Sequence, residues 1–251
     1  TTRLGGVSAD IVSTMNLSFT RGEEEAAGRE NYRRLARALG AEVGQFVCSD
    51  QTHTVNVRRV TAADAGKGLT RERDYRDVDG LITDEPGLVL STFYADCVPL
   101  YVVDPVHRAI GMSHSGWRGT AARMGAVTLS AMQEAYGTRP EDVVCAVGPS
   151  ICKDCYEVSA DVADIFAEEF PGHEQEILAE SEKNSVGMAH ADKKYQLDLW
   201  KANEIIFQEA GVRKEHLAVT DICTCCNPKL LFSHRASHGK RGNLGGFLYL
   251  K

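Results

Sequence analysis

The stretch YADCVPLYVVDPVHRAIGMSHSGWRGTAARMG, residues 94–125, combines apolar strand-like runs with polar residues that core packing does not require. VPLYVVD at 98–104 and RAIGMSHSG at 108–116 predict two buried strands. Cys97 ends the apolar run before them, and His114 lies at the end of the second strand. Side chains at strand ends meet turns and solvent, so we expect Cys97 and His114 to lie where chemistry can occur.

Apolar patterns on both sides of this stretch alternate between strand and helix. Val-, Thr- and Leu-rich runs predict further strands at residues 45–60, 87–97, 142–149, 217–223 and 245–251. Apolar periodicity and glycine or proline stops predict helices at 22–40, 119–137, 159–170 and 197–211. This alternation predicts an α/β fold with at least one mixed sheet. Because neither a low-complexity linker nor an internal repeat interrupts the chain, we expect a single domain over residues 1–251.

Composition restricts the class of function. The 251 residues are 43% hydrophobic and 25% charged, which is typical of a soluble globular protein. A net charge of −7 argues against a broad nucleic-acid surface, and no apolar run approaches the ~20 residues that span a bilayer. No signal peptide precedes the first motif, so we expect a cytoplasmic protein with reduced or metal-bound cysteines.

His53, Cys97 and His114 are the candidate metal ligands and, in part, the candidate catalytic residues. If QTHTV is a strand, alternation places His53 on the same face as Gln51 and Val55. Two imidazoles and a thiolate suit zinc and leave a fourth position open for water or substrate. A buried cysteine with two hydrogen-bonded histidines fits these residues equally well. In a third interpretation Cys97 is the nucleophile and His114 the base of a metal-free cysteine hydrolase or deamidase.

Two Arg-Gly segments are candidate anion sites. HSGWRGT opens the predicted helix at about residue 119, where Gly116 and Gly119 allow close approach and Arg118 can contact a phosphate. TTRLGGVS places Arg3 before two glycines. The alternative is a pair of glycine turns with surface arginines.

The other cysteines and two loops have less specific patterns. Cys152 and Cys155 form a C-x-x-C, and CTCC contributes Cys223, Cys225 and Cys226. These residues suit a structural zinc site, a redox pair or simple burial. The charged segment 63–80 is either a mobile lid or a solvated connection, and SHRASHGKRGN is expected to form a loop with one basic substrate contact.

Several motifs, taken together in chain order, resemble the YfiH-type family, also called the laccase-domain or multicopper polyphenol oxidoreductase family. The motifs are TTRLGGVS, MNLSF, QTHTV, ADCVPLYVVD, HSGWRGT, GPSICKDCYEV, DLWKAN and CTCCNPKLLFSHR. The resemblance covers nearly the whole chain. It implies one zinc ion held by His53, Cys97 and His114. It also implies a layered α/β/β/α sandwich with mixed sheets, related to cysteine-hydrolase toxin domains.

The family carries two functional labels, which the histidine content helps to weigh. A four-copper oxidase needs roughly ten histidines, mostly in His-x-His pairs, whereas this chain has eight and no such pair. A single copper ion in the same site is the alternative cofactor and would give weak phenol oxidation. The second label is phosphorolysis of adenosine, inosine, guanosine or methylthioadenosine, with adenosine deamination as a side activity. Zinc-activated water and Arg-Gly anion sites favour this second label.

Motif membership also implies roles for residues outside the metal site. Asp96 either neighbours the metal or only braces its turn. A purine nucleoside and phosphate are the only binding partners predicted. The residues expected to contact them are Arg3, Asn16, Arg118 and Tyr156. The chain departs from the family in two places. It lacks the strand that usually precedes the TTR motif, so we expect further residues before Thr1. Its HRASHGKRGN end differs from the usual pattern, which leaves Arg235 and Arg241 without assigned roles.

Overall fold

The two apolar runs of the opening stretch form the central hairpin of the molecule. In the computed structural model, which describes residues 1–184 and 187–251, β5 (Val98–Asp104) pairs antiparallel with β6 (Ala109–Ser115). Pro99 lies opposite His114 in this pairing. Both predicted strands are confirmed, and their register brings His114 close to the start of β5, which follows Cys97.

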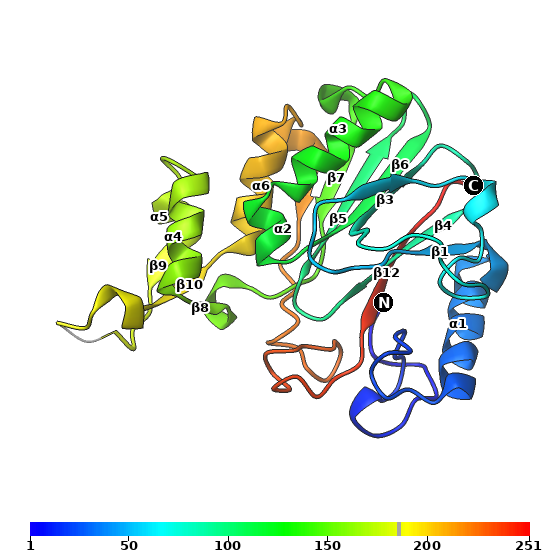
Figure 1. The fold of residues 1–251 in the computed structure, drawn as a ribbon, viewed down its shortest axis with the longest axis horizontal. Coiled ribbons are helices and arrows are strands. Elements are labelled where there is room, and N and C mark those ends of the chain that lie inside the picture. Colours follow the sequence, from blue (N-terminus) through cyan, green and yellow to red (C-terminus); the bar gives the residue numbers. More distant parts are fainter. Residues whose placement is uncertain (185–186) are drawn as a thin grey trace.

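Four further strands extend the hairpin into a six-stranded sheet (Figure 1). They are β2 (Val57–Arg59), β3 (Gly80–Thr83), β7 (Val144–Val147) and β11 (Leu217–Val219). The order across the sheet is β11-β7-β5-β6-β3-β2. The two outer pairs are parallel and the inner pairs antiparallel, so the sheet is mixed as predicted.

A second, three-stranded sheet packs against the first. Its strands are β1 (Phe46–Cys48), β4 (Val89–Tyr94) and β12 (Leu244–Leu248), in the order β1-β4-β12. Because β4 belongs to this sheet and β5 to the other, residues 95–97 carry the chain from one sheet to the other. Asp96, with a φ of 88°, makes the corner.

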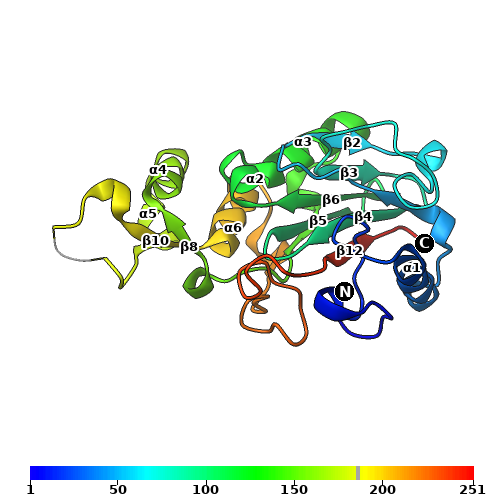
Figure 2. The same cartoon turned by 60° about the horizontal axis from the view of Figure 1, so that its bottom comes forward.

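Helices cover the outer faces of both sheets, which gives the predicted α/β/β/α order (Figure 2). α1 (Glu25–Leu39) packs on the three-stranded sheet through Tyr32 and Leu35, which share a buried cluster with Phe46 of β1. The other outer face is covered by α3 (Met124–Tyr136) and α6 (Leu199–Glu209). The α/β class and its layers are therefore confirmed.

Because side chains alternate along β6, one face of this strand packs against the second sheet and the other packs under the helices. Ile110 and Met112 are buried in the cluster between the sheets, whereas Ala109 belongs to the cluster under the helices. Gly111 faces α3 so closely that a Cβ there would lie 2.8 Å from the sulfur of Met132. Period-two burial of apolar residues thus fixes both sides of the sheet.

A third sheet was not foreseen from the sequence. It is antiparallel, with the order β8-β10-β9, and consists of β8 (Glu157–Ser159), β9 (Leu178–Glu180) and β10 (Lys194–Leu197). Together with α4 (Ala160–Glu169) and α5 (Glu174–Ile177) it projects from one end of the molecule (Figure 1). Strands of three or four residues are too short for their apolar alternation to be recognised in the sequence.

Three predicted elements differ from the structure. Residues 45–60 form not one strand but β1 and β2, separated by a loop. The predicted helix 119–137 is two helices, α2 (Trp117–Ala121) and α3, because Arg123 adopts a left-handed φ of 59° between them. The predicted strand 217–223 ends at Val219. Across the described residues, no helix is long and apolar enough to cross a membrane.

Candidate metal centre

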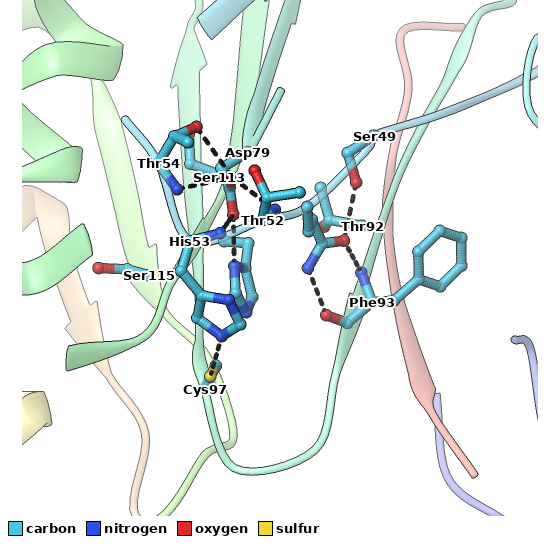
Figure 3. Close-up of polar contacts among 12 residues, drawn as sticks. Ser49, Thr52, His53, Thr54, Asp79, Thr92, Phe93, Cys97, Ser113 and Ser115 are labelled. Carbon is cyan, nitrogen blue, oxygen red and sulfur yellow. Dashed lines mark hydrogen bonds and ion pairs between the residues drawn. The ribbon is translucent and has the colours of Figure 1, made fainter. Parts of the chain in front are cut away.

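His53, Cys97 and His114 come together from three separate segments. Figure 3 shows His53 beside Cys97. Their candidate ligand atoms all lie within 4.8 Å of one another, and Cys97 Sγ is 3.9 Å from His53 Nε2. The two imidazole rings meet edge to face, with centroids 4.9 Å apart. His53 is exposed, Cys97 half-buried and His114 buried, so the cluster lies at the surface end of a buried network.

Asp79, which the sequence did not single out, organises this network. Its carboxylate is fully buried and accepts hydrogen bonds from the backbone N–H groups of Thr52, His53 and Thr54, at 2.9–3.2 Å. These bonds hold the backbone around His53, whose φ is 67°. The predicted strand alternation at His53 is therefore wrong, because the loop follows a carboxylate from another segment rather than a ladder of strand hydrogen bonds.

The same carboxylate also fixes the orientation of His114. Nδ1–H of His114 donates to Asp79 Oδ1 at 2.8 Å, and the His114 backbone N–H donates to the Asp79 carbonyl at the same distance. With Nδ1 protonated, Nε2 of His114 is left free to bind a cation. A carboxylate behind a histidine is the usual arrangement around zinc ligands, so the donor set suits a metal.

In the absence of a metal, Cys97 and His114 form a coupled acid–base pair. Burial alone would raise the pKa of the Cys97 thiol and lower that of the His114 imidazole. The attraction between thiolate and imidazolium outweighs burial and brings the pKa of Cys97 down to about 6. The same attraction, together with Asp79, raises the pKa of His114 to about 9. Burial would raise the pKa of Asp79 as well, but its bond with His114 keeps that pKa below the usual value.

Close packing around the cluster explains one of the glycines in HSGWRGT. A Cβ on Gly116 would lie 3.0 Å from Cys97 Sγ and 3.0 Å from His53 Cδ2. The bare backbone thus lets two of the three candidate ligands approach. Gly116 therefore borders the candidate ligands, and the short helix α2 begins at the next residue, Trp117. The anion contact expected of this segment stays a prediction.

Asp96 braces the corner that presents Cys97. Its carboxylate accepts hydrogen bonds from Thr224 Oγ1 and from the backbone N–H of Arg235, both at 2.7 Å. Its carbonyl accepts the N–H of Ile151 at 3.0 Å. Both carboxylate oxygens are therefore engaged by neighbouring segments, which supports the bracing interpretation.

The cluster lies in the wall of a cavity of about 390 Å³. Aromatic rings and arginines share this wall, namely Phe19, Arg21, Tyr32, Arg73, Phe93 and Arg241. Arg73 is already paired with Asp50 at 2.6 Å. By contrast, buried Nε of Arg241 has no hydrogen-bond partner among the described residues. Burial and the charge of Arg21 lower the pKa of Arg241 to about 10, so the two cations lie close together without full compensation.

Two predicted substrate contacts, Arg3 and Asn16, have structural partners instead. The guanidinium of Arg3 donates to the carbonyls of Ser13 and Pro228 at 2.7–3.0 Å. Asn16 is fully buried, and its amide bonds the backbone of Ser18 and the carboxylate of Glu23. Neither side chain lines the cavity.

Arg118 and Tyr156 are also absent from the cavity lining. Arg118 is exposed, with its guanidinium 4.1 Å from the centre of the Trp117 ring. The guanidinium of Arg235 stacks over the Tyr156 ring at 5.4 Å. Of the cavity arginines, Arg241 belongs to the loop in which one basic substrate contact was expected. Arg21 was not singled out by the sequence, although it directly precedes the predicted helix 22–40.

The charged segment 63–80 is exposed at residues 70–74, as a solvated connection would be, but it is buried at residues 78–80 and contributes to the site. Lys67 Nζ bridges Asp64 at 2.7 Å and Asp74 at 2.8 Å. Arg73 of the same segment lines the cavity, and the segment also contains Asp79. Its charges therefore hold one wall of the cavity in place. SHRASHGKRGN forms a succession of turns before β12, as expected for a loop.

Comparison with known proteins gives matches along the whole chain. Residues 1–251 match the family described as multi-copper polyphenol oxidoreductase laccase. Purine nucleoside phosphorylase YlmD of Bacillus subtilis is 33% identical over 255 residues, covering 100% of this chain and 87% of that protein. Its counterpart in Geobacillus stearothermophilus is 34% identical and covers 99% and 88%. The crystal structure of the hypothetical protein YfiH of Bacillus licheniformis matches with a TM-score of 0.91 at 31% identity, covering 100% and 91%.

The resemblance inferred from the motifs is thus confirmed over the full length of the sequence. The fold, the Cys/His cluster able to bind a metal and these relatives agree with one another. The chain belongs to the multi-copper polyphenol oxidoreductase laccase family of enzymes, whose curated relatives named above are purine nucleoside phosphorylases.

Proposed function

We propose that this chain, acting as a single catalytic domain, is a zinc-dependent purine nucleoside phosphorylase with adenosine deaminase as a side activity. The observation that carries the proposal is the meeting of the His53, Cys97 and His114 cluster with uncompensated arginines in one cavity. A phosphorolytic enzyme must hold phosphate and nucleoside side by side. The names of the full-length relatives support the same reaction.

His53, Cys97 and His114 are the proposed zinc ligands. Two nitrogens and one sulfur suit this borderline-soft ion, and three protein ligands leave one position open. When bound there, zinc supplies Lewis-acid activation and a water of lowered pKa, which accounts for deamination at the purine C6. Asp79 serves by holding Nδ1–H of His114 and the backbone of His53.

Arg21 and Arg241 are the proposed phosphate contacts. Burial and the charge of Arg21 both lower the pKa of Arg241. An anion between the two arginines would offset their repulsion and give the Nε of Arg241 a partner. Phe19 and Phe93 offer aromatic faces in the same wall for the purine. Positioning of phosphate near the anomeric carbon, with charge stabilisation as the base departs, supplies catalysis without a covalent enzyme intermediate.

The cysteine hydrolase remains a second candidate, because the structure contains the third group that this mechanism requires. Asp79 orients His114, and His114 lies beside a thiol of lowered pKa, as in a Cys-His-Asp arrangement. The two candidates use Cys97 and His114 alike and differ at His53. That residue is a ligand in the first candidate and dispensable in the second.

The distribution of histidines supports an oxidase less well than it supports the phosphorylase. Of the eight histidines, only His53 and His114 belong to either of the two Cys/His groupings found among the described residues. One copper ion in the proposed zinc site is the remaining route to phenol oxidation. Phenol turnover measured before and after copper loading of zinc protein tests this route, and strong activity without copper would contradict it.

The decisive experiment uses protein of verified zinc content with inosine or adenosine, with and without phosphate. We expect free base and ribose 1-phosphate only when phosphate is present, together with slow conversion of adenosine to inosine. The His53→Ala variant should lose phosphorolysis, whereas a cysteine hydrolase would keep its activity. No base release at any phosphate concentration would show that the proposed reaction is wrong.

A further inference from the structure

Two C-x-x-C pairs that are distant in the sequence meet behind the corner that presents Cys97. Cys152 and Cys155 lie on one segment, and Cys223 and Cys226 on the other. The four sulfur atoms all lie within 4.8 Å of one another, and those of Cys155 and Cys226 are 3.4 Å apart. All four are free thiols. None of them lines the cavity beside the proposed zinc ligands.

This spacing fits the coordination shell of one zinc ion. Zn–S bonds of about 2.3 Å in a tetrahedron place neighbouring sulfurs ~3.8 Å apart. Four sulfurs within 4.8 Å thus need only small rotations about their side-chain bonds to close on a single ion. Two C-x-x-C pairs form a ligand pattern common among structural zinc sites, in which no position is left for substrate.

The backbone around Cys223 is arranged for a thiolate. Cys223 Sγ accepts the N–H of Cys152 at 3.3 Å and the N–H of Cys226 at 3.4 Å. Each segment thus contributes one amide to the same sulfur. Such bonds stabilise the negative charge that a metal-bound thiolate retains. The guanidinium of Arg235, which donates to the Cys155 carbonyl at 3.2 Å, adds a positive charge beside the cluster.

We propose that Cys152, Cys155, Cys223 and Cys226 bind a second metal ion, a structural Zn²⁺ distinct from the one in the cavity. It would join the segment after β7 to the segment after β11. These segments already touch through a bridge between Ser150 and Cys223. The same two segments bond Asp96, through Ile151 and Thr224. The second ion therefore stabilises the corner that aims Cys97 into the cavity.

Cys225 provides the matched control within the same motif. It lies between Cys223 and Cys226 but outside the group of four. A Cys225→Ser variant should keep the metal, whereas Cys155→Ser and Cys226→Ser should lose it. Because the last two variants also weaken the corner around Asp96, the principal test leaves the four cysteines intact.

That test measures zinc in a His53→Ala/Cys97→Ser double variant, purified without added metal. We expect one zinc per chain, with an X-ray absorption spectrum of four sulfur ligands at about 2.3 Å. Zinc-free double variant, or zinc with nitrogen and oxygen ligands, would overturn the proposal. A disulfide between Cys155 and Cys226 in freshly purified, metal-free protein would overturn it in favour of a redox pair.

Metal content separates this proposal from the proposed function. If both hold, the unmodified chain contains two zinc ions and each set of variants loses one. If only the four-cysteine site exists, the unmodified chain and the His53→Ala/Cys97→Ser variant both contain one. Exchange with Co²⁺ in the double variant should give the strong absorption of a four-thiolate tetrahedral complex, and its absence would contradict the assignment.

Discussion

The molecule holds two groups of side chains that could bind a metal ion, and the two groups differ in what surrounds them. His53, Cys97 and His114 lie in the wall of a cavity, and Asp79 holds their loop and one imidazole. The four-cysteine group lies outside that cavity, and two backbone N–H groups donate to the Sγ of Cys223. Three ligands facing a cavity suit catalysis, whereas four that complete a tetrahedron suit a structural ion. The shape of the surroundings thus distinguishes the two groups better than the number of cysteines does.

Removing one ligand from each group should give the largest difference between them: loss of catalysis in the first and loss of thermal stability in the second. We expect Cys97→Ser to lower kcat/KM for phosphorolysis on the order of 10³-fold or more, because the Lewis acid contributes several kcal/mol. Cys226→Ser should mainly lower the melting temperature. Steady-state kinetics on folded protein and thermal unfolding measure the two effects. Comparable losses of kcat/KM at equal folded fraction would contradict the division.

Loss of the Asp79 carboxylate should weaken only the first group. Asp79→Asn removes the negative charge and one of the two acceptor oxygens that hold His114 and the backbone around His53, and such supporting residues typically contribute 10–100-fold in metal affinity or activity. Zinc affinity measured by competition with a chelator checks this expectation. Asp104→Asn is the matched control, since Asp104 is equally buried and holds His107 at the same 2.8 Å but far from the cavity. Equal losses in both variants would assign Asp79 a role in stability alone.

Alkylation of the metal-free protein should distinguish Cys97 from the other cysteines by its rate and by the pH dependence of that rate. A Cys97 pKa of about 6 means that the thiolate predominates at pH 7, so its alkylation rate should rise through pH 6 and then level off. An ordinary thiol rises through about pH 8.5, so at pH 7 the thiolate fraction of Cys97 is roughly 30-fold higher. Burial raises the pKa of Cys48 and Cys145 to about 12, so both should stay unmodified. Mass spectrometry of timed samples measures each site, and bound zinc should protect Cys97.

Substitution of a cavity arginine should weaken the binding of phosphate more than the binding of the nucleoside. Arg241→Gln removes a charged contact worth about 1.5 kcal/mol, so we expect the KM for phosphate to rise roughly tenfold. Deamination of adenosine, which uses no phosphate, should change little. Arg118→Gln, an exposed substitution outside the cavity, is the control. A larger effect in the control would return the phosphate site to the HSGWRGT segment.

Sequence patterns predicted the α/β class and the three ligand candidates, and the family resemblance implied the layers, but neither showed what holds those candidates in place. The β5–β6 hairpin follows from apolar runs, because local burial determines it. His53 does not follow from alternation, since Asp79 from a later segment determines its backbone. The break at Arg123 lies in a sequence with good helix propensity, where tertiary contacts override local preference. The C-x-x-C spacing favours Cys226 over Cys225, but no spacing rule could show that this pair meets Cys152 and Cys155 in space.

Gly116 offers the finest test of the first group, because it changes the packing around the ligands without touching a ligand. Gly116 has a φ of −75°, so alanine fits its backbone without strain. The added Cβ would, however, lie 3.0 Å from both Cys97 Sγ and His53 Cδ2, closer than ordinary contact. Displacing two ligands by a few tenths of an ångström costs about 1 kcal/mol, so zinc affinity should fall roughly fivefold. Gly119→Ala is the control, since the nearest atom to its added Cβ would be the His114 carbonyl oxygen, at an ordinary 3.5 Å. Chelator competition on both variants measures the difference, and the four-cysteine ion should remain bound in each. Unchanged affinity in Gly116→Ala would mean that the three ligands have more freedom than their packing indicates.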